Sequence, residues 1–356
     1  MRILFFINHL ADGGAERVAA TLLNHLCENH EVELVLFSEK QASYNINPKI
    51  PTRKIIVNGN NKIIKVIRRV SKIRKLIKET NPDLIITFMV DLSMQVLLAN
   101  CLTSNKLIVS EHITIQTTRQ LHRLITRHIL YRFASKIVFI SRSDYNYAKW
   151  IKRKTYIYNP LCYPITQTSH KEKHIVAIGP QKRWRSKGFD MLISAWSKIA
   201  PSHPEWKLQF IGANNDNYIR DLVKSFSLVK RVEFLGWTDE IDKVLQTKSI
   251  YVLSSRREGF PCSLIEAMSQ GCACLAFDCK TGPNEIITDG ESGLLVKNGD
   301  IDDLANKLEI LINDEQLRHR LSAAAIDEVK RFDKNVFFAQ WDKLIEGVCE
   351  NEISIS

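Results

Sequence analysis

The sequence of 356 residues lacks any apolar run near the roughly 20 residues that a membrane-spanning helix needs. Its first residues, MRILFFINHLADGG, carry no basic segment and no small-residue cleavage site, so we expect no secretory signal peptide. The eight cysteines show neither a C-x-x-C pair nor a zinc-type spacing with histidine, and we expect reduced, packed thiols. Hydrophobic residues make up 45 % and charged residues 25 %, which excludes a disordered or collagen-like chain.

Several ligand signatures are also missing. Neither G-x-G-x-x-G nor G-x-x-x-x-G-K-S/T follows the first apolar run, which argues against a dehydrogenase and a P-loop enzyme. Zinc-finger spacing and an RNA-binding aromatic signature are absent too, so we expect no nucleic-acid partner. Asp300 and Asp302 spell D-x-D, but they follow Gly299 at the start of a helical pattern and indicate an acidic first turn. We therefore expect no metal cofactor.

Negative charge is scarce in the first half of the chain. Residues 1–165 hold 25 of the 50 basic residues but 11 of the 39 acidic ones, a net charge of +14, whereas the remainder has −3. Such a surface favours an anionic partner: nucleic acid, phospholipid or a phosphate-bearing substrate. A basic nucleic-acid-binding protein without catalysis is therefore an alternative of another class.

Short, β-branched apolar runs alternate with helical patterns along the whole chain, which predicts two doubly wound parallel sheets, an α/β fold. The polar stretch 166–173 predicts a linker between domains 1–165 and 174–334. An apolar stripe in 335–356 predicts a final helix, whose docking domain the pattern leaves open. The thirteen expected strands are Ile3–Asn8, Val32–Phe37, Lys54–Val57, Leu84–Phe88, Leu107–Ser110, Ile137–Ile140, Thr155–Tyr158, His174–Gly179, Lys207–Gly212, Val232–Gly236, Ser249–Leu253, Cys272–Phe277 and Gly293–Val296.

Three candidate ligand loops each follow an expected strand. Gly13 and Gly14 open a helix whose backbone N–H groups can approach a phosphate, although a plain tight turn would look the same. His112 follows the fifth strand, where a parallel sheet binds ligands, or is a surface or capping histidine. Four cations follow the eighth strand: Lys182, Arg183, Arg185 and Lys187. They could bind a diphosphate, or they could belong to a solvated surface loop.

Two carboxylates eight residues apart, Glu258 and Glu266, make the sharpest motif. Glu258 lies in a loop with no evident structural need for it. Glu266 has a structural alternative, because Ser263-x-x-Glu266 fits a capping box at the start of a helix that ends near Gly271. A further turn, 282–285, could offer a ligand backbone N–H groups or a carboxylate, and turn chemistry alone would also explain it.

These motifs resemble the retaining, nucleotide-sugar-dependent glycosyltransferases of GT-B family four over nearly the whole chain. The resemblance rests on Gly13–Glu16, the Lys187–Asp190 loop, Glu258–Pro261 with Glu266, residues 282–285 and 289–296. It implies two facing Rossmann-like domains, with the nucleotide sugar mainly on the second and the final helix crossing back to the first. It implies a bacterial enzyme of surface-polysaccharide or O-antigen assembly.

The resemblance also implies roles for residues. Glu258, His112 and Lys187 would be catalytic, with Glu258 on hydroxyls of the transferred sugar and Glu266 on the ribose. The family usually has an arginine directly after the glycine of this loop, and here Gly179 is followed by a longer segment, so the partner of Lys187 is Lys182, Arg183 or Arg185, of which we choose Arg183. The nucleotide-sugar set is Gly13, Gly14, Arg17, Arg183, Lys187, Glu258, Gly259, Phe260, Pro261, Leu264 and Glu266.

Two stretches, 61–79 and 119–136, read as basic amphipathic helices, either on an anionic membrane surface or as ordinary domain helices. In the first, Ile63, Ile67, Val70, Ile73 and Ile77 would form the apolar face. Some bacterial members of the family extend glycans on a polyprenyl diphosphate. We expect Lys62, Lys65, Arg69 and Lys72 to contact that carrier or the lipid.

The sequence thus predicts a retaining, metal-independent hexosyl- or N-acetylhexosaminyltransferase at the inner face of the cell membrane. Its donor would be a UDP-sugar, because residues 282–285 resemble family members that use UDP-sugars. Its acceptor would be a polyprenyl-diphosphate-linked glycan. GDP-mannose is the alternative donor.

Overall fold

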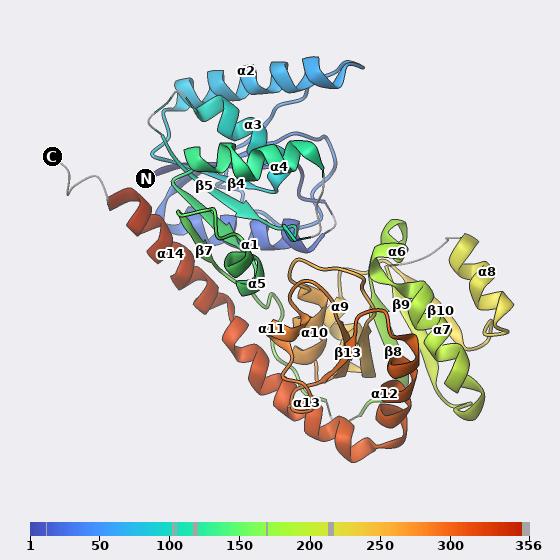
Figure 1. The fold of residues 1–356 in the computed structure, drawn as a ribbon. Coiled ribbons are helices and arrows are strands. Elements are labelled where there is room, and N and C mark those ends of the chain that lie inside the picture. The colour runs from blue at the N-terminus through green and yellow to red at the C-terminus, as the bar shows by residue number, and fades with distance from the viewer. Residues whose placement is uncertain are drawn as a thin grey trace. The chain divides into compact units, whose positions relative to one another are not determined.

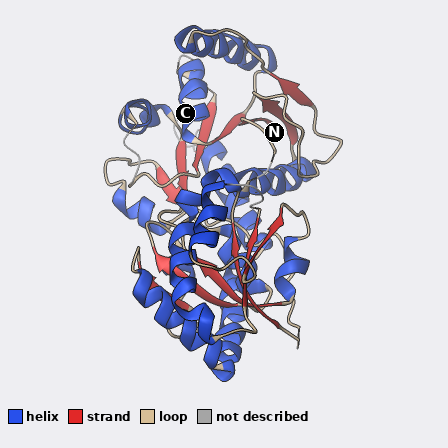
Figure 2. Ribbon diagram, turned by 90° about the vertical axis from the view of Figure 1, so that its right-hand side faces the viewer, coloured by secondary structure: helices blue, strands red, loops and turns tan. Residues whose placement is uncertain are grey.

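The computed structural model describes residues 1–11, 13–101, 103, 105–116, 120–168, 170–212 and 217–350. The chain forms two compact units (Figure 1). The first comprises Met1–Pro160 together with the chain from Lys334, and the second comprises Leu161–Asp333. Each unit has its own parallel sheet, flanked by helices (Figure 2).

The sheet of the first unit has seven parallel strands in the order β3-β2-β1-β4-β5-β6-β7. Its strands are rich in Ile, Leu, Val and Phe because central strands of such a sheet are covered on both faces. The bounds are β1 Arg2–Ile7, β2 Glu31–Leu36, β3 Thr52–Lys54, β4 Leu84–Phe88, β5 Lys106–Glu111, β6 Lys136–Phe139 and β7 Lys154–Tyr156. The helices are α1 Gly14–Asn29, α2 Lys62–Thr80, α3 Val90–Asn100, α4 Leu121–His128, α5 Arg142–Tyr147 and α14 Lys334–Glu350, with a 3₁₀ turn, η1, at Leu130–Phe133.

The sheet of the second unit has six parallel strands in the order β10-β9-β8-β11-β12-β13. Its core gathers Trp196, Trp206 and Phe210 around the strands. The bounds are β8 Glu172–Ile178, β9 Lys207–Ile211, β10 Val232–Gly236, β11 Lys248–Leu253, β12 Ala273–Asp278 and β13 Leu294–Lys297. The helices are α6 Trp184–Lys187, α7 Phe189–Ile199, α8 Asn217–Ser225, α9 Ile241–Gln246, α10 Cys262–Ser269, α11 Pro283–Ile286, α12 Ile301–Asn313 and α13 Glu315–Val329, with 3₁₀ turns η2 Gln181–Arg183, η3 Ala200–Ser202 and η4 Lys330–Phe332.

All thirteen expected strands are present, and the α/β fold is confirmed. Only β3 is displaced: it ends at Lys54, where the predicted strand began. Ile55 and Val57 are buried, so their apolar character reflects packing against the core rather than membership of the sheet. The predicted linker 166–173 is tied to the second unit, where the Thr166 N–H donates to the Ser269 carbonyl and β8 begins at Glu172.

The last helix, α14, packs on the first unit and is drawn in red in Figure 1. Phe337, Trp341 and Ile345 are buried along one face of the helix. Trp341 stacks on Phe88 at 6.3 Å between ring centroids, and His25 Nε2 lies 2.9 Å from the Asp342 carboxylate. The polypeptide therefore returns to its first sheet after completing the second.

Each sheet has one point where the strand order reverses. In the first unit this point lies between β1 and β4, and in the second between β8 and β11. Loops that leave the carboxyl ends of such neighbouring strands diverge, and open α/β sheets bind ligands in the crevice they leave. The glycine loop follows β1, whereas the cationic loop and the Glu258 loop follow β8 and β11.

Candidate functional site

Lys187 and Glu258 meet at the reversal point of the second sheet. Lys187 ends α6, after β8, and its Nζ lies 2.8 Å from Glu258 Oε1 in the loop after β11. The Ser255 hydroxyl donates to the same Oε1 at 2.6 Å. Both side chains of the ion pair are largely buried, at 13 % and 10 % exposed. Two residues that sequence reasoning assigned to one ligand are therefore in direct contact.

The electrostatics of Glu258 follow from this contact. Burial alone would raise the pKa of its carboxyl group. The charge of Lys187, the hydrogen bonds from Lys187 and Ser255, and the charge of Arg183 outweigh burial, so the pKa of Glu258 lies below its usual range. Glu258 is thus a carboxylate at neutral pH. Among the three candidate partners of Lys187, Arg183 is one whose charge acts on Glu258.

The loop that carries Lys187 is held by the loop that carries Glu258. Arg256 donates to both carboxylate oxygens of Asp190, at 2.8 and 2.7 Å, and to the carbonyl of Arg185 at 2.6 Å. Its backbone N–H donates to the carbonyl of Ser186 at 2.9 Å. The hydroxyl of Ser254 donates to the carbonyl of Lys187, also at 2.9 Å. These contacts fix the backbone on both sides of Lys187.

Gly188 makes this junction possible. It has a φ of 65°, a left-handed conformation that favours glycine, and a Cβ at this position would overlap the carbonyl oxygen of Ser254. Gly179, directly after β8, lies under the Lys187 stem, since a Cβ there would be 2.7 Å from Lys187 Cγ. Both glycines are therefore required by close packing around Lys187.

Glu266 is a buried residue of α10 and not part of a capping box, so that structural alternative is wrong. The helix begins at Cys262, after Pro261, and no side chain caps it. Ser263 instead accepts a hydrogen bond from the Tyr251 hydroxyl at 2.8 Å. The charges of Glu258 and Glu266 both act on Tyr251, although burial is the main reason why its pKa is raised. The helix ends at Ser269, and Gly271 follows with the expected left-handed φ of 70°.

The turn 282–285 packs against the Glu258 loop. A Cβ on Gly282 would be 2.7 Å from Pro261 Cδ and 3.2 Å from Phe260 Cα. Glu258 donates its backbone N–H to Lys280, and its carbonyl accepts from Thr281. Gly259, Phe260 and Pro261 are therefore supported by this turn, and Leu264 is buried in α10.

In the first unit the glycine loop opens α1 at Gly14, as predicted. Gly13 precedes the helix, and its carbonyl accepts from the N–H of Arg17 at 3.1 Å. The Tyr44 hydroxyl bridges the N–H and the carbonyl of Gly13, at 3.2 and 3.0 Å. The carboxylate of Glu16 lies against Gly13, so the helix already holds an acid near its positive end.

His112 lies just beyond β5 in the same unit. Its Nε2 is 2.9 Å from the Ser110 hydroxyl, and its ring stacks on Phe88 at 4.5 Å. Burial lowers the pKa of His112 to about 3, so the imidazole is neutral at physiological pH. A neutral imidazole can donate or accept one hydrogen bond, which suits contact with a sugar hydroxyl.

The adjacent Glu111 is the centre of a buried network. It forms an ion pair with Arg127 at 3.0 Å, and both side chains are almost completely inaccessible. Tyr131 donates its hydroxyl to Glu111, and Arg127 also reaches the carbonyl of Ile113 at 3.3 Å. This network fixes the backbone on both sides of His112. The sequence analysis did not predict the network.

The prediction of a basic surface helix over 119–136 is wrong for Arg127, which this network buries. Arg123 also has an acidic partner, Asp91, at 2.7 and 2.6 Å. Arg119 lies outside the described residues. Arg132 is exposed beyond α4. Two of the four arginines of the expected positive face are therefore paired with acids within the unit.

The four cations chosen on α2 differ in their surroundings. Lys62 is exposed and Lys65 half-buried at the start of the helix. Arg69 places its guanidinium over the Phe37 ring at 5.8 Å from the centroid, and Lys72 donates to the carbonyl of Ile56 at 3.1 Å. Lys62 and Lys72 are thus exposed, whereas Lys65 and Arg69 are half-buried.

Asp300 caps α12 by accepting a hydrogen bond from the N–H of Asp303, which confirms the acidic first turn. Within the described ranges, no three His, Cys, Asp or Glu side chains gather as a metal site. None of the described helices is both long and apolar enough to span a bilayer.

Two family models match the chain: Glycosyltransferase Family 4 over residues 12–161 and Glycosyl transferases group 1 over residues 165–328. The two matches fall on the two sheets. The protein therefore belongs to the GT-B glycosyltransferases built from these two domains, and it is an enzyme of that class.

Relatives support this assignment. The chain is 27 % identical over 356 residues to the GalNAc-alpha-(1->4)-GalNAc-alpha-(1->3)-diNAcBac-PP-undecaprenol alpha-1,4-N-acetyl-D-galactosaminyltransferase of Campylobacter jejuni, covering 98 % of this chain and 99 % of that one. It is 26 % identical to the amylovoran biosynthesis glycosyltransferase AmsD of Erwinia amylovora, covering 97 % and 99 %.

Solved structures share the fold. The lipopolysaccharide outer core galactosyltransferase WaaB superposes with a TM-score of 0.78 at 21 % identity, covering 98 % of this chain and 99 % of that one. Anabaena HepE in complex with UDP superposes with a TM-score of 0.81 at 19 % identity, covering 98 % and 100 %.

Replacing Gly188 by alanine tests the junction between the two loops. Gly290 also has a positive φ, 77°, but a Cβ there would meet nothing within 4 Å, so Gly290→Ala is a matched control for backbone strain alone. We expect Gly290→Ala to lower the free energy of unfolding by about 1 kcal/mol and Gly188→Ala by at least about 2 kcal/mol more, measured by urea denaturation. Equal losses of unfolding free energy in the two variants would mean that the contact with Ser254 does not contribute to the cost of Gly188→Ala.

Proposed function

We propose that the enzyme transfers a hexose or N-acetylhexosamine from a UDP-sugar to a polyprenyl-diphosphate-linked glycan during surface-polysaccharide assembly. The observation that carries the donor assignment is the Lys187–Glu258 pair at the reversal point of the second sheet, with Arg183 close enough to act on it. A cationic loop next to buried carboxylates matches the two parts of a nucleotide sugar, an anionic diphosphate and neutral hydroxyls.

Each candidate site residue suits a different part of the nucleotide sugar. Lys187 and Arg183 bind the diphosphate, and Glu258 accepts hydrogen bonds from hydroxyls of the transferred sugar. Glu266 accepts those of the ribose, because two vicinal hydroxyls suit one carboxylate. His112, held neutral by burial, contacts the donor sugar, and the N-terminus of α1 at Gly14 adds a positive potential.

The mechanism follows from where charge develops. Breaking the anomeric C–O bond leaves positive charge on the sugar and negative charge on the departing diphosphate. Lys187 is held in place by Glu258, and its backbone by Ser254, so it stabilises the leaving group with little reorganisation. The acceptor oxygen bonds to the anomeric carbon on the face from which UDP leaves, which retains the anomeric configuration, and the hydroxyl proton passes to the departing diphosphate.

The acceptor proposal rests on α2 and on the name of one relative. The Campylobacter jejuni enzyme acts on a glycan carried by undecaprenyl diphosphate. In this chain α2 has eight lysines and arginines and one glutamate. A carrier diphosphate in the cytoplasmic leaflet is anionic, so Lys62, Lys65, Arg69 and Lys72 are the proposed contacts at the inner face of the membrane.

Binding of UDP tests the donor site. A ligand that binds only the folded state raises the melting temperature, so we expect UDP and UDP-sugars to stabilise the protein. Glu266→Ala should raise the UDP concentration needed for a given rise in melting temperature at least tenfold. Replacing Glu291, an exposed carboxylate of the same unit, by alanine should leave that concentration unchanged. Stabilisation by GDP alone would redirect the proposal to GDP-mannose. No shift with any nucleotide, with retention on heparin, would favour the nucleic-acid-binding alternative.

Chelation tests metal independence. Since Lys187 and Arg183 supply the positive charge for the leaving group, we expect transfer to continue in the presence of EDTA. The measurement is release of UDP with and without the chelator. Loss of turnover that magnesium or manganese restores would contradict the mechanism.

Charge reversal on α2 tests the acceptor. Lys62→Glu with Lys65→Glu should raise the apparent KM for a lipid-linked acceptor about tenfold, because each basic residue near an anionic surface contributes on the order of 1 kcal/mol. The KM for the UDP-sugar should not change. Lys224→Glu with Lys230→Glu, two exposed lysines of the second unit, is the matched control. An unchanged acceptor KM would refute this contact.

A further inference from the structure

Ser110 and His112 lie on the same face of the first sheet. Side chains alternate along a strand, so Ser110 near the end of β5 and His112 just beyond it point to one side, and Glu111 points to the other. Arg127 binds Glu111 on that other side. In the β4–β5 ladder Ser110 is paired with Phe88, which therefore shares its face. The imidazole is thus next to a hydroxyl and a phenyl ring that belong to neighbouring strands.

Stacking fixes the plane of the imidazole but not its orientation within that plane. The Phe88 ring lies 4.5 Å from the His112 ring at an interplanar angle of 23°. Phe88 is held in turn by Phe5 at 5.0 Å and by Trp341 of α14 at 6.3 Å between ring centroids. Half a turn about the Cβ–Cγ bond keeps an imidazole in the same plane but exchanges its nitrogens with carbons, and this torsion is roughly two-fold. Another contact must therefore select one of the two orientations.

The hydroxyl of Ser110 supplies that contact. Its Oγ lies 2.9 Å from Nε2 of His112. Over the part of the chain that the structure describes, Nδ1 of His112 is buried and has no hydrogen-bond partner. Half a turn of the ring would place a carbon opposite Oγ and remove the bond. The hydrogen bond to Ser110 therefore decides which edge of the imidazole faces the strand.

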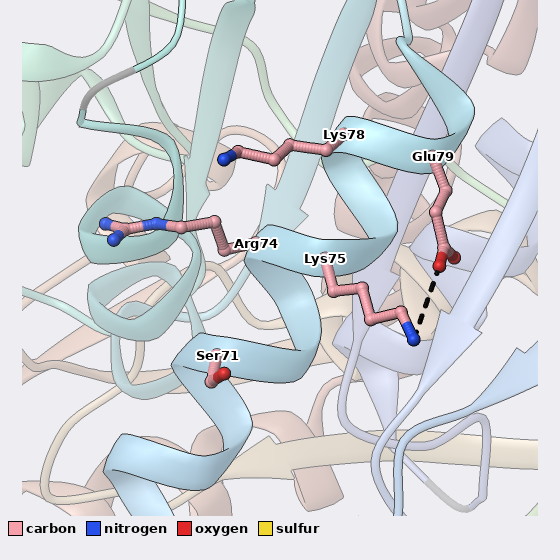
Figure 3. A pocket seen from close by; sticks show the side chains of 5 residues that line it. All are labelled: Ser71, Arg74, Lys75, Lys78 and Glu79. Atoms are coloured by element: carbon pink, nitrogen blue, oxygen red, sulfur yellow. Dashed lines mark ion pairs between the residues drawn. The ribbon is translucent and has the colours of Figure 1, made fainter.

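The restraint on His112 differs from that on the basic side chains of α2. Figure 3 shows Lys75 and Lys78 extending from that helix beside a surface depression of about 390 Å³. Both lysines are exposed, and a long exposed side chain retains many rotamers. The His112 ring, by contrast, is held on its face and at one nitrogen. It therefore keeps one orientation, as a group that contacts a reacting sugar needs.

A count of hydrogen-bond partners assigns the tautomer. Burial lowers the pKa of His112 to about 3, so the ring is neutral and carries a single hydrogen. Ser110 is 1 % exposed, and among the described residues its hydroxyl bonds to His112 alone. With the hydrogen on Nε2, both the hydroxyl hydrogen and the Nδ1 lone pair would be buried without a protein partner. With the hydrogen on Nδ1, the hydroxyl donates to Nε2 and only Nδ1–H lacks one. The second arrangement is favoured, because each unpaired buried polar group costs free energy.

We infer that Ser110 is a positioning residue, which holds His112 in the Nδ1–H tautomer so that the imidazole donates a hydrogen bond to an oxygen of the transferred sugar. The inference rests on the proposed function only in naming a sugar. Since Nε2 already accepts from Ser110, the ring has a hydrogen to offer and no free acceptor. A sugar hydroxyl can therefore pair with His112 through its oxygen lone pair.

Nitrogen NMR of the full chain, with nitrogen-15 in its histidines, tests the tautomer without any ligand. A ring nitrogen that carries hydrogen resonates apart from a bare one, and His112→Asn identifies the signals of His112 among the ten histidines. We expect hydrogen on Nδ1 in the wild type and a shift toward Nε2–H in Ser110→Ala. Hydrogen on Nε2 in the wild type, or an unchanged tautomer in Ser110→Ala, would overturn the inference.

The matched control is Ser93→Ala. Ser93 is also a fully buried serine of the first unit, and its hydroxyl donates to the carbonyl of Met89 at 3.0 Å. This variant removes a buried hydroxyl that does not bond to the imidazole. The His112 tautomer should therefore stay as in the wild type.

Kinetics connect the tautomer with the reaction. The measurement is UDP release from UDP-glucose, UDP-galactose and their N-acetyl counterparts. We expect Ser110→Ala to lower kcat about tenfold, the value of one hydrogen bond, and Ser110→Thr, which keeps a hydroxyl, to restore most of it. Ser93→Ala should leave kcat unchanged. An unchanged kcat in Ser110→Ala would overturn the role of Ser110.

The thermal shift with UDP separates this inference from the donor assignment. The rise in melting temperature should be the same in the Ser110 and Ser93 variants as in the wild type, because Lys187 and Arg183 belong to the second unit. Absence of the rise in the wild type would refute the donor assignment, and the NMR result would still decide whether Ser110 sets the tautomer.

Discussion

The ion pair between Lys187 and Glu258 is the interaction on which the candidate site depends. Burial favours the protonated form of a carboxylate that has no partner. Lys187 offsets this effect at Glu258 and lowers the pKa of its carboxyl group, and the Ser255 hydroxyl satisfies a further lone pair of the carboxylate. This requirement explains why the backbone around both residues is so closely held: Arg256, Ser254 and Gly188 join the two loops at several points. A small shift of either loop would separate the charges.

The two units use charge differently. In the second unit the cations of the β8 loop stand beside carboxylates, and the charge of the remainder of the chain from residue 166 is close to balanced. In the first unit some acids pair with cations of the same unit, as in Glu111–Arg127 and Asp91–Arg123, whereas α2 keeps an excess of cations. Concentrating positive charge on one helix, rather than spreading it over the unit, gives a directional attraction to an anionic surface. In the proposed function, this division gives the nucleotide diphosphate to the second unit and an anionic acceptor to the first.

The sequence predicted the strands well because central strands of a parallel sheet are covered on both faces and so are apolar throughout, as in Leu84–Phe88 and Ala273–Phe277. It placed Lys187 and Glu258 after two strands of one sheet, and the strand order of the structure, with β8 beside β11, brings them together. The sequence could not predict the salt bridge between Arg256 and Asp190, because two residues 66 positions apart leave no local pattern. It left a capping box open as an alternative for Glu266, because the Ser263-x-x-Glu266 spacing imitates one although the helix begins at Cys262. It also misjudged Arg127, since helical periodicity cannot show that this side chain forms a buried ion pair with Glu111.

The isoleucines of α2 show why periodicity fails at the edge of a domain. A helical apolar pattern reports which side chains favour a non-aqueous environment, and it does not report whether protein provides it. From Ile63 to Ile73 the helix rises about 15 Å, far enough to carry its first turns beyond the core that buries its last ones. The helical period alone therefore cannot separate Ile63, Ile64 and Ile67, which are exposed, from Ile73, Leu76 and Ile77, which the first unit buries.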